Sequence, residues 1–190
     1  MIESVCVFCG SRAGRRPIYG QAAEALGRAL ARAGIRVIYG GGHVGLMGQL
    51  ADATMAAGGE VVGMIPERLL EREVGHRTIS SLIVTSDMFD RKSRMIEDAD
   101  AFLILPGGLG TFDELLEVVT LRQLGYHSKP IILIDLDGYF AVWATLVDQV
   151  VDEGFAAADA PGLFQIVQGI DGALDALALE PAEVEPARTL

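Results

Sequence analysis

The pattern that decides the fold is clearest in Pro106-Gly107-Gly108-Leu109-Gly110-Thr111-Phe112-Asp113-Glu114, which follows the apolar run Ala101–Leu105 and opens a helical pattern. A strand, a glycine-rich turn and the start of a helix are therefore expected in succession. Glycines let the backbone approach a ligand closely, and the first N–H groups of a helix are unpaired at the positive end of its dipole. Such a turn suits a phosphate. The spacing matches neither G-x-G-x-x-G nor G-x-x-x-x-G-K-[ST], which favours a smaller ligand with one phosphate over NAD or ATP.

The rest of the chain repeats this alternation of short apolar runs and helical patterns. The runs are rich in β-branched residues and continuously apolar, as in parallel strands buried on both faces. Strands are expected at Val5–Phe8, Val37–Tyr39, Val61–Ile65, Leu82–Thr85, Ala101–Leu105 and Ile131–Ile134. Helices are expected at about 17–33, 45–57, 88–98, 111–124 and 138–152. This order predicts an α/β fold, a Rossmann-like, doubly wound, mostly parallel sheet with helices on both faces.

This fold also predicts where a ligand binds. In an open parallel sheet the ligand crevice lies outside the carboxyl ends of the strands. Three glycine-rich turns fall there: Gly10-Ser11, Gly40–Gly42 and Pro106–Gly110. Residues 1–180 are expected to form a single nucleotide-binding domain, and the acidic, proline-containing tail at 181–190 is expected to fray. The charged connection at 66–80 is either a solvated face or a flap over the crevice.

The composition narrows the classes of partner. The chain has 190 residues, of which 51% are hydrophobic, and a formal net charge of −11 at pH 7. This acidic balance gives no electrostatic footprint for nucleic acid or an anionic membrane surface, although it leaves room for a local basic pocket. The sequence shows neither a signal-peptide pattern nor an apolar stretch of the length that spans a membrane. We expect a soluble, cytoplasmic protein without nucleic-acid or membrane partners.

Cys6 and Cys9 form a C-x-x-C motif, which occurs in redox and zinc sites. On a strand, residues three apart point to opposite faces, whereas a redox pair of this kind sits at the start of a helix. No second C-x-x-C occurs, and His43, His76 and His127 are not at metal-ligand spacing. We therefore expect no disulfide, no metal and no cofactor.

Two charged residues are the candidates for chemistry. Arg91 shares a predicted helix face with Met88 and other apolar residues, where a guanidinium needs a partner. It either snorkels, pairs with a carboxylate such as Asp87 or Glu114, or contacts a ligand. Glu114 lies three residues after Thr111, which is the spacing of a capping box. Its carboxylate therefore either caps the helix or takes part in chemistry.

Several blocks stand in a recognisable order over roughly residues 4–155. They are Phe8-Cys9-Gly10-Ser11, Gly40–Gly48, Met88-Phe89-Asp90-Arg91-Lys92, the 106–114 stretch and Gln123–Pro130. Together they resemble the Lonely Guy family of cytokinin-nucleotide phosphoribohydrolases, long mislabelled as lysine decarboxylases, whose signature is P-G-G-x-G-T-x-x-E. The resemblance implies hydrolysis of the N-glycosidic bond of adenosine 5′-monophosphate, N6-prenylated forms included, to free base and ribose 5-phosphate. It also implies a homodimer, which the surplus of apolar residues on the helices at 88–98 and 111–124 favours.

The resemblance assigns roles at matching positions. Glu114 matches the catalytic carboxylate and Arg91 the arginine of the family's M-H-x-R-K block, and both are predicted to be catalytic. Glu73 either contacts the substrate, as in the family, or is a solvated charge. Thr120 either reaches the ligand from a neighbouring subunit or packs on its own helix backbone. The predicted substrate contacts are Gly10, Ser11, Gly41, Gly42, Glu73, Met88, Lys92, Pro106, Gly107, Gly108, Leu109, Gly110, Thr111 and Thr120.

Two positions depart from the family pattern. Phe89 stands where the family usually has His, which removes a polar group near the expected base pocket and leaves the base open, whereas Asp113 in place of Glu keeps the charge. A non-catalytic nucleotide or molybdenum-cofactor carrier on the same fold is the alternative function. A pyridoxal-dependent decarboxylase needs a Schiff-base lysine, and neither Lys92 nor Lys129 lies in a recognisable pyridoxal motif.

Overall fold

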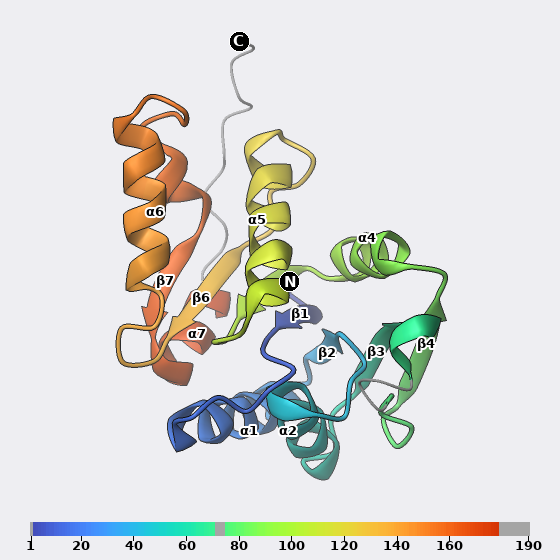
Figure 1. The fold of residues 1–190 in the computed structure, drawn as a ribbon. Helices are drawn as coiled ribbons and strands as arrows, with labels where there is room; N and C mark the ends of the chain where they lie inside the picture. The colour runs from blue at the N-terminus through green and yellow to red at the C-terminus, as the bar shows by residue number, and fades with distance from the viewer. Residues whose placement is uncertain (1, 71–74, 179–190) are drawn as a thin grey trace.

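The computed structural model describes residues 2–70 and 75–178, which form an open sheet with helices on both faces (Figure 1). Within these residues the sheet has seven strands in the order β4-β3-β2-β1-β5-β6-β7, and every neighbouring pair is parallel. The strands are β1 Ser4–Phe8, β2 Arg36–Tyr39, β3 Val61–Pro66, β4 Ser81–Thr85, β5 Ala101–Ile104, β6 Ile131–Asp135 and β7 Gln165–Gln168. The predicted Rossmann-like, doubly wound fold is confirmed.

The two faces of the sheet are covered by separate groups of helices. One face, with Val5 and Val7 of β1, packs against α1, α2 and α7; the other, with Cys6 and Phe8, packs against α4, α5 and α6. Because successive strand side chains point to opposite faces, both sets are buried, which explains the continuously apolar runs. Cys6 and Cys9 fall into different clusters, as predicted. The helices are α1 Pro17–Arg32, α2 Gly45–Ala56, α3 Glu67–Leu70, α4 Met88–Asp98, α5 Leu109–Gln123, α6 Ala141–Asp152, the 3-10 helix η1 Ala160–Leu163 and α7 Gly169–Ala178.

The C-terminal part of the fold differs from the expectation. β7 and α7 were not predicted, because Gln165–Gln168 is a mostly exposed edge strand with polar ends and lacks an apolar run. Helix α6 begins at Ala141, three residues later than expected. The carboxylate of Asp135 accepts hydrogen bonds from the backbone N–H groups of Gly138 (3.0 Å) and Phe140 (2.8 Å), which holds the intervening residues in a turn.

The charged connection between β3 and β4 begins as the short helix α3. Glu73 and its neighbours at 71–74, like the tail at 179–190, lie outside the described residues. Beyond them, Gly75 forms an isolated antiparallel bridge with Gly42, so the connection returns to the loop that follows β2. None of the helices in the described parts of the chain is long and apolar enough to cross a membrane.

The strand order reverses at β1, which lies between β2 and β5. The chain runs outward from β1 through β2, β3 and β4, and then resumes on the other side with β5, β6 and β7. The loops that leave β1 and β5 therefore diverge, and a crevice is expected between them. The two loops meet at their base, where the N–H of Gly10 donates to the carbonyl of Pro106 (3.2 Å).

Candidate active site

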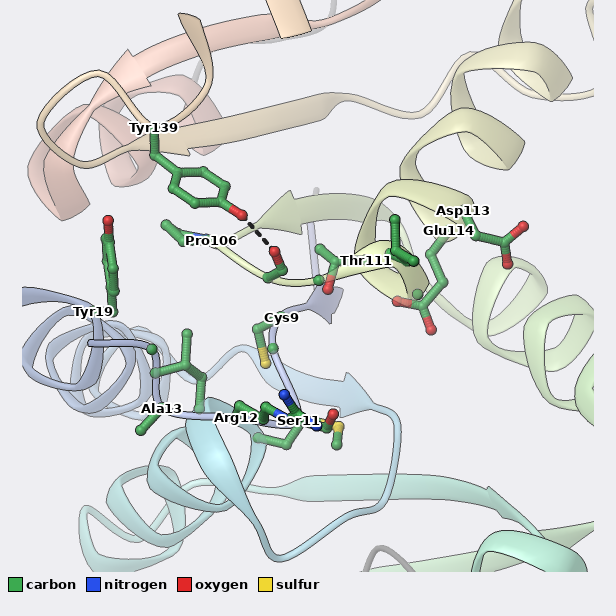
Figure 2. A pocket seen from close by; sticks show the side chains of 18 of the residues that line it. Cys9, Ser11, Arg12, Ala13, Tyr19, Pro106, Thr111, Asp113, Glu114 and Tyr139 are labelled. Atoms are coloured by element: carbon green, nitrogen blue, oxygen red, sulfur yellow. Dashed lines mark hydrogen bonds between the residues drawn. The ribbon is translucent and has the colours of Figure 1, made fainter. Parts of the chain in front are cut away.

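A cavity of about 580 Å³ opens at this switch point (Figure 2). Two of the three predicted glycine turns form its walls, the 9–14 loop after β1 and the 106–111 turn after β5. Side chains from α1, α2, α3, α4 and α5 and from the loop after β6 complete it. Of the predicted substrate contacts, those that line it are Gly10, Ser11, Met88, Pro106, Gly107, Gly108, Leu109, Gly110 and Thr111.

One glycine in each of the two turns is required by close packing. A Cβ on Gly10 would lie 2.9 Å from the carbonyl oxygen of Arg12, and a Cβ on Gly107 would lie 2.0 Å from the Oγ1 of Thr111. The carbonyl of Gly107 accepts a hydrogen bond from the hydroxyl of Tyr139, drawn as a dashed line in Figure 2. The turn after β5 is thus held from both sides, by the helix that follows it and by the loop after β6.

Helix α5 starts two residues earlier than the sequence predicts. Its N-cap is Gly108, which has no side chain to cap with, so Thr111 is the third helical residue. The capping-box interpretation of Thr111 and Glu114 is therefore wrong. Gly108, Leu109 and Gly110 are exposed, so the first N–H groups of α5 face the cavity without a side-chain cap. This is the arrangement that binds a phosphate.

Arg91 and Glu114 meet inside the cavity wall. The Nη2 of Arg91, on α4, lies 3.4 Å from the Oε1 of Glu114, in the second turn of α5, and their side chains are 6% and 10% exposed. Arg91 therefore does not snorkel. Asp87, its other predicted partner, instead accepts hydrogen bonds from the N–H groups of Phe89 and Asp90 as the N-cap of α4.

The third glycine turn, Gly40–Gly42, affects the site through Gly40, which lies against the Arg91 side chain. A Cβ on Gly40 would lie only 2.2 Å from the Nη2 of Arg91, so the absence of a side chain makes room for the guanidinium. Gly41 and Gly42, the predicted contacts, are buried and do not belong to the described lining. Gly41 has a φ of +77° instead, which directs the loop toward its bridge with Gly75.

Lys92 is not among the described lining residues of the cavity, although one of its partners, Asp113, is. Its Nζ lies 3.1 Å from Asp113 and 3.0 Å from Glu117, both on α5. Burial by itself lowers the pKa of Lys92, but the hydrogen bonds to the two carboxylates outweigh it and raise the pKa. The side chain links α4 to α5, and its ammonium is engaged by these two carboxylates.

Thr120 and Phe89 lie outside the described lining of the cavity. Thr120 is exposed on α5 and is not among the described lining residues. Phe89, which replaces the family's usual His, is 79% exposed and its ring lies 5.8 Å from the Nζ of Lys92. Glu73 lies outside the described residues.

Sequence reasoning missed several lining residues, among them Cys9, Arg12, Tyr19, Met47 and Tyr139. Arg12 is an exposed cation beside the turn after β1, and its position directly after Gly10-Ser11 was the signal that could have found it. Tyr19 and Tyr139 come from distant segments and meet edge to face at 5.8 Å. Burial raises the pKa of the Cys9 thiol well above its usual range, so Cys9 is not a thiolate nucleophile.

One family model and many curated relatives match this chain. The model, described as "Possible lysine decarboxylase", matches residues 47–177. The chain is 48% identical over 153 residues to the cytokinin riboside 5′-monophosphate phosphoribohydrolase LOG7 of Arabidopsis thaliana, covering 80% of this chain and 70% of that protein. It is 46% identical over 155 residues to the probable cytokinin riboside 5′-monophosphate phosphoribohydrolase LOGL1 of Oryza sativa subsp. japonica, covering 82% and 70%.

Among solved structures, the molybdenum cofactor binding protein of Rippkaea orientalis matches with a TM-score of 0.70 over 93% of this chain and 96% of that chain. At 20% identity this is a likeness of fold alone. The relatives at 46–48% identity are related much more closely, and the family model spans most of the chain. The chain therefore belongs to the family of cytokinin riboside 5′-monophosphate phosphoribohydrolases, the Lonely Guy family.

Proposed function

We propose that this protein hydrolyses the N-glycosidic bond of adenosine 5′-monophosphate and its N6-modified forms, releasing the free base and ribose 5-phosphate. The observation that carries the proposal is the Arg91–Glu114 pair, which lies in the same cavity as the uncapped start of α5. The two relatives described above are named for this reaction on cytokinin riboside 5′-monophosphates.

The phosphate is placed at the start of α5. The N–H groups of its first turn and the Gly107-Gly108 backbone line the cavity, and the cationic Arg12 lines it as well. Glu114 follows the first helical residue, Leu109, by five positions, which is about 7.5 Å along the helix axis. A ribose 5-phosphate anchored at the turn therefore brings its C1′ toward the carboxylate of Glu114.

Glu114 then acts on the bond that breaks. As the C1′–N bond lengthens, its electron pair moves to the base, and positive charge develops on the sugar as an oxocarbenium ion. A carboxylate beside C1′ stabilises that charge. Water supplies the hydroxyl that adds to C1′ and the proton that the base acquires. Arg91 fixes the carboxylate through its 3.4 Å contact, and it lines the same cavity, where it can contact the sugar hydroxyls.

Lysine decarboxylation does not fit the residues of this chain. A pyridoxal enzyme needs a lysine in the cofactor pocket, and the chain contains only Lys92 and Lys129. Lys92 is paired with carboxylates of α5, and the Nζ of Lys129 donates to the carbonyls of Ile96 (2.7 Å) and Glu97 (3.0 Å). Neither belongs to the described lining of the cavity.

We further propose that the protein is a homodimer that pairs through the exposed faces of α4 and α5. Large apolar side chains are exposed there: Met88 (39%), Phe89 (79%), Leu109 (91%), Leu116 (49%) and Leu124 (64%). Such surfaces are typical of protein interfaces. Light scattering should give twice the 20.2 kDa chain mass. A particle of the single-chain mass would reject the dimer and any contribution of Thr120 across an interface.

Base release from nucleoside monophosphates tests the reaction. AMP should yield adenine and ribose 5-phosphate, while adenosine should react far more slowly, because the phosphate supplies binding energy remote from the broken bond. The Glu114→Gln variant should stay folded and bind AMP while turnover falls by roughly 10²-fold or more. Glu117→Gln, the same change one turn further along α5, is the control and should remain active. Tight binding of nucleotide without base release from any monophosphate would instead favour a carrier.

A further inference from the structure

Two of the three histidines come together with a carboxylate outside the cavity. His43 lies in the loop between β2 and α2, Asp52 on α2 and His76 in the segment before β4. The bridge between Gly42 and Gly75 and the hydrogen bond from the His76 N–H to the Gly41 carbonyl (2.9 Å) place the loop beside that segment. The two imidazoles consequently stack, with ring centroids 4.0 Å apart. The spacing in the sequence predicts no metal site, because the backbone pairing that joins the two histidines is not local.

The donor atoms of the three residues lie close together. The Nε2 atoms of His76 and His43 lie 3.0 Å and 3.5 Å from the two carboxylate oxygens of Asp52, and one donor atom from each residue fits within 4.8 Å of the others. A tetrahedral zinc ion with bonds of about 2.0–2.1 Å has ligand atoms about 3.3 Å apart. The two nitrogen–oxygen distances, 3.0 Å and 3.5 Å, lie on either side of that value.

The surroundings favour metal binding over a plain ion pair. The His76 side chain is 1% exposed, and its Nε2 faces the Asp52 carboxylate. Its other nitrogen, Nδ1, lies 3.2 Å from the hydroxyl of Thr78. That hydroxyl can accept the N–H of the tautomer whose Nε2 faces a metal, as partners of metal-bound histidines commonly do.

We propose that His43, Asp52 and His76 bind one divalent transition-metal ion of the zinc class, with water in the fourth position. Two imidazoles and one carboxylate suit Zn²⁺ and Co²⁺ better than Mg²⁺ or Ca²⁺, which prefer oxygen ligands. His76 is 1% exposed and fixed, while the His43 side chain is 45% exposed, so His43 can turn to bring both ring planes onto the ion. None of the three belongs to the described lining of the cavity. The ion therefore has a structural role, in which it links the loop after β2 to the segment before β4.

Calorimetric titration of tag-free protein with Zn²⁺ tests the site, with Co²⁺ as the spectroscopic probe. We expect one Zn²⁺ per chain, a zinc-dependent rise in the melting temperature, and visible Co²⁺ absorption typical of a tetrahedral site. His43→Ala and Asp52→Asn change exposed side chains and should fold, yet each should weaken zinc binding at least tenfold. Thr78→Val should weaken it by about 10-fold to 100-fold.

Asp148→Asn, on the exposed side of α6, is the matched control and should bind zinc like the unmodified protein. Calcium and magnesium should not raise the melting temperature. The proposal is overturned if the unmodified protein takes up no Zn²⁺, or if His43→Ala and Asp52→Asn bind it as tightly as the control. An octahedral Co²⁺ spectrum that is unchanged in both variants would equally place the ion elsewhere.

Discussion

Replacing Gly40 by alanine should separate the position of Arg91 from the stability of the fold. The added Cβ would lie 2.2 Å from the Nη2 of Arg91 and 3.0 Å from the Sδ of Met47. Both atoms belong to the far ends of flexible side chains, so the backbone is not forced to move. Arg91 is 5% exposed, and its guanidinium can yield only by leaving its place beside Glu114.

The size of the effect follows from that distance. A contact that is tolerated begins near 3.4 Å, so the guanidinium must retreat by about 1 Å, which breaks the 3.4 Å approach to Glu114. A misplacement of about 1 Å at a catalytic group costs on the order of 10²-fold in rate. Overpacking by one methyl costs about 1–3 kcal/mol, and we expect the lower end because side-chain ends absorb the strain.

Adenine release from AMP and thermal unfolding should be measured together for Gly40→Ala. The matched control is Gly162→Ala in η1, where an added Cβ meets nothing within 4 Å. We expect Gly40→Ala to be folded and about 10²-fold slower, and Gly162→Ala to be close to the unmodified protein in both measurements. A folded Gly40→Ala protein with normal turnover would show that the position of Arg91 does not matter to the reaction.

Three further changes give distinct outcomes. Tyr139→Phe removes the hydrogen bond to the Gly107 carbonyl, so the KM for AMP should rise several-fold and the free energy of unfolding should fall by about 1 kcal/mol. An unchanged KM would show that this hydrogen bond does not contribute to phosphate binding. Lys92→Met loses the contacts with the two carboxylates on α5, so the free energy of unfolding measured in urea should fall by about 1–2 kcal/mol, while turnover should stay within a few-fold of normal. A stable but inactive variant would indicate instead that Lys92 contacts the substrate. Burial lowers the pKa of His127 below 6.5, so the folded state binds fewer protons than the unfolded chain and stability should fall as the pH drops from 7 to 5. His127→Gln cannot titrate and should flatten that slope, whereas parallel urea profiles for the two proteins would exclude His127 as its source.

The sequence by itself determined the class of fold and the edge at which the site lies. Strands buried on both faces must be apolar at every position, so β1, β2, β3, β5 and β6 are visible as continuous runs. Glycine turns that follow such strands must lie at their carboxyl ends, because all strands of the sheet run in the same direction. β7 was invisible because an exposed edge strand carries no such constraint.

Which side chains meet was decided only by the tertiary structure. Thr111 and Glu114 satisfy a local capping pattern, yet the helix starts at Leu109 with Gly108 as its N-cap. The two residues before that cap, Pro106 and Gly107, are held by hydrogen bonds from the loop after β1 and the loop after β6. The neighbours Arg91 and Lys92 separate in the same way. Arg91 pairs with Glu114, whereas Lys92 pairs with Asp113 and Glu117.

The cluster of His43, Asp52 and His76 shows most clearly that the sequence alone does not reveal which side chains meet. Periodicity and spacing report burial and turns, which depend on residues close together in the chain. The approach of His43 to His76 depends on a bridge between two loops and on the packing of α2 against them. Interactions of that kind join residues far apart in the sequence and produce no periodic pattern in it. The local pattern therefore determined the positions of the strands, helices and turns, and the tertiary packing determined which side chains lie close enough to act together.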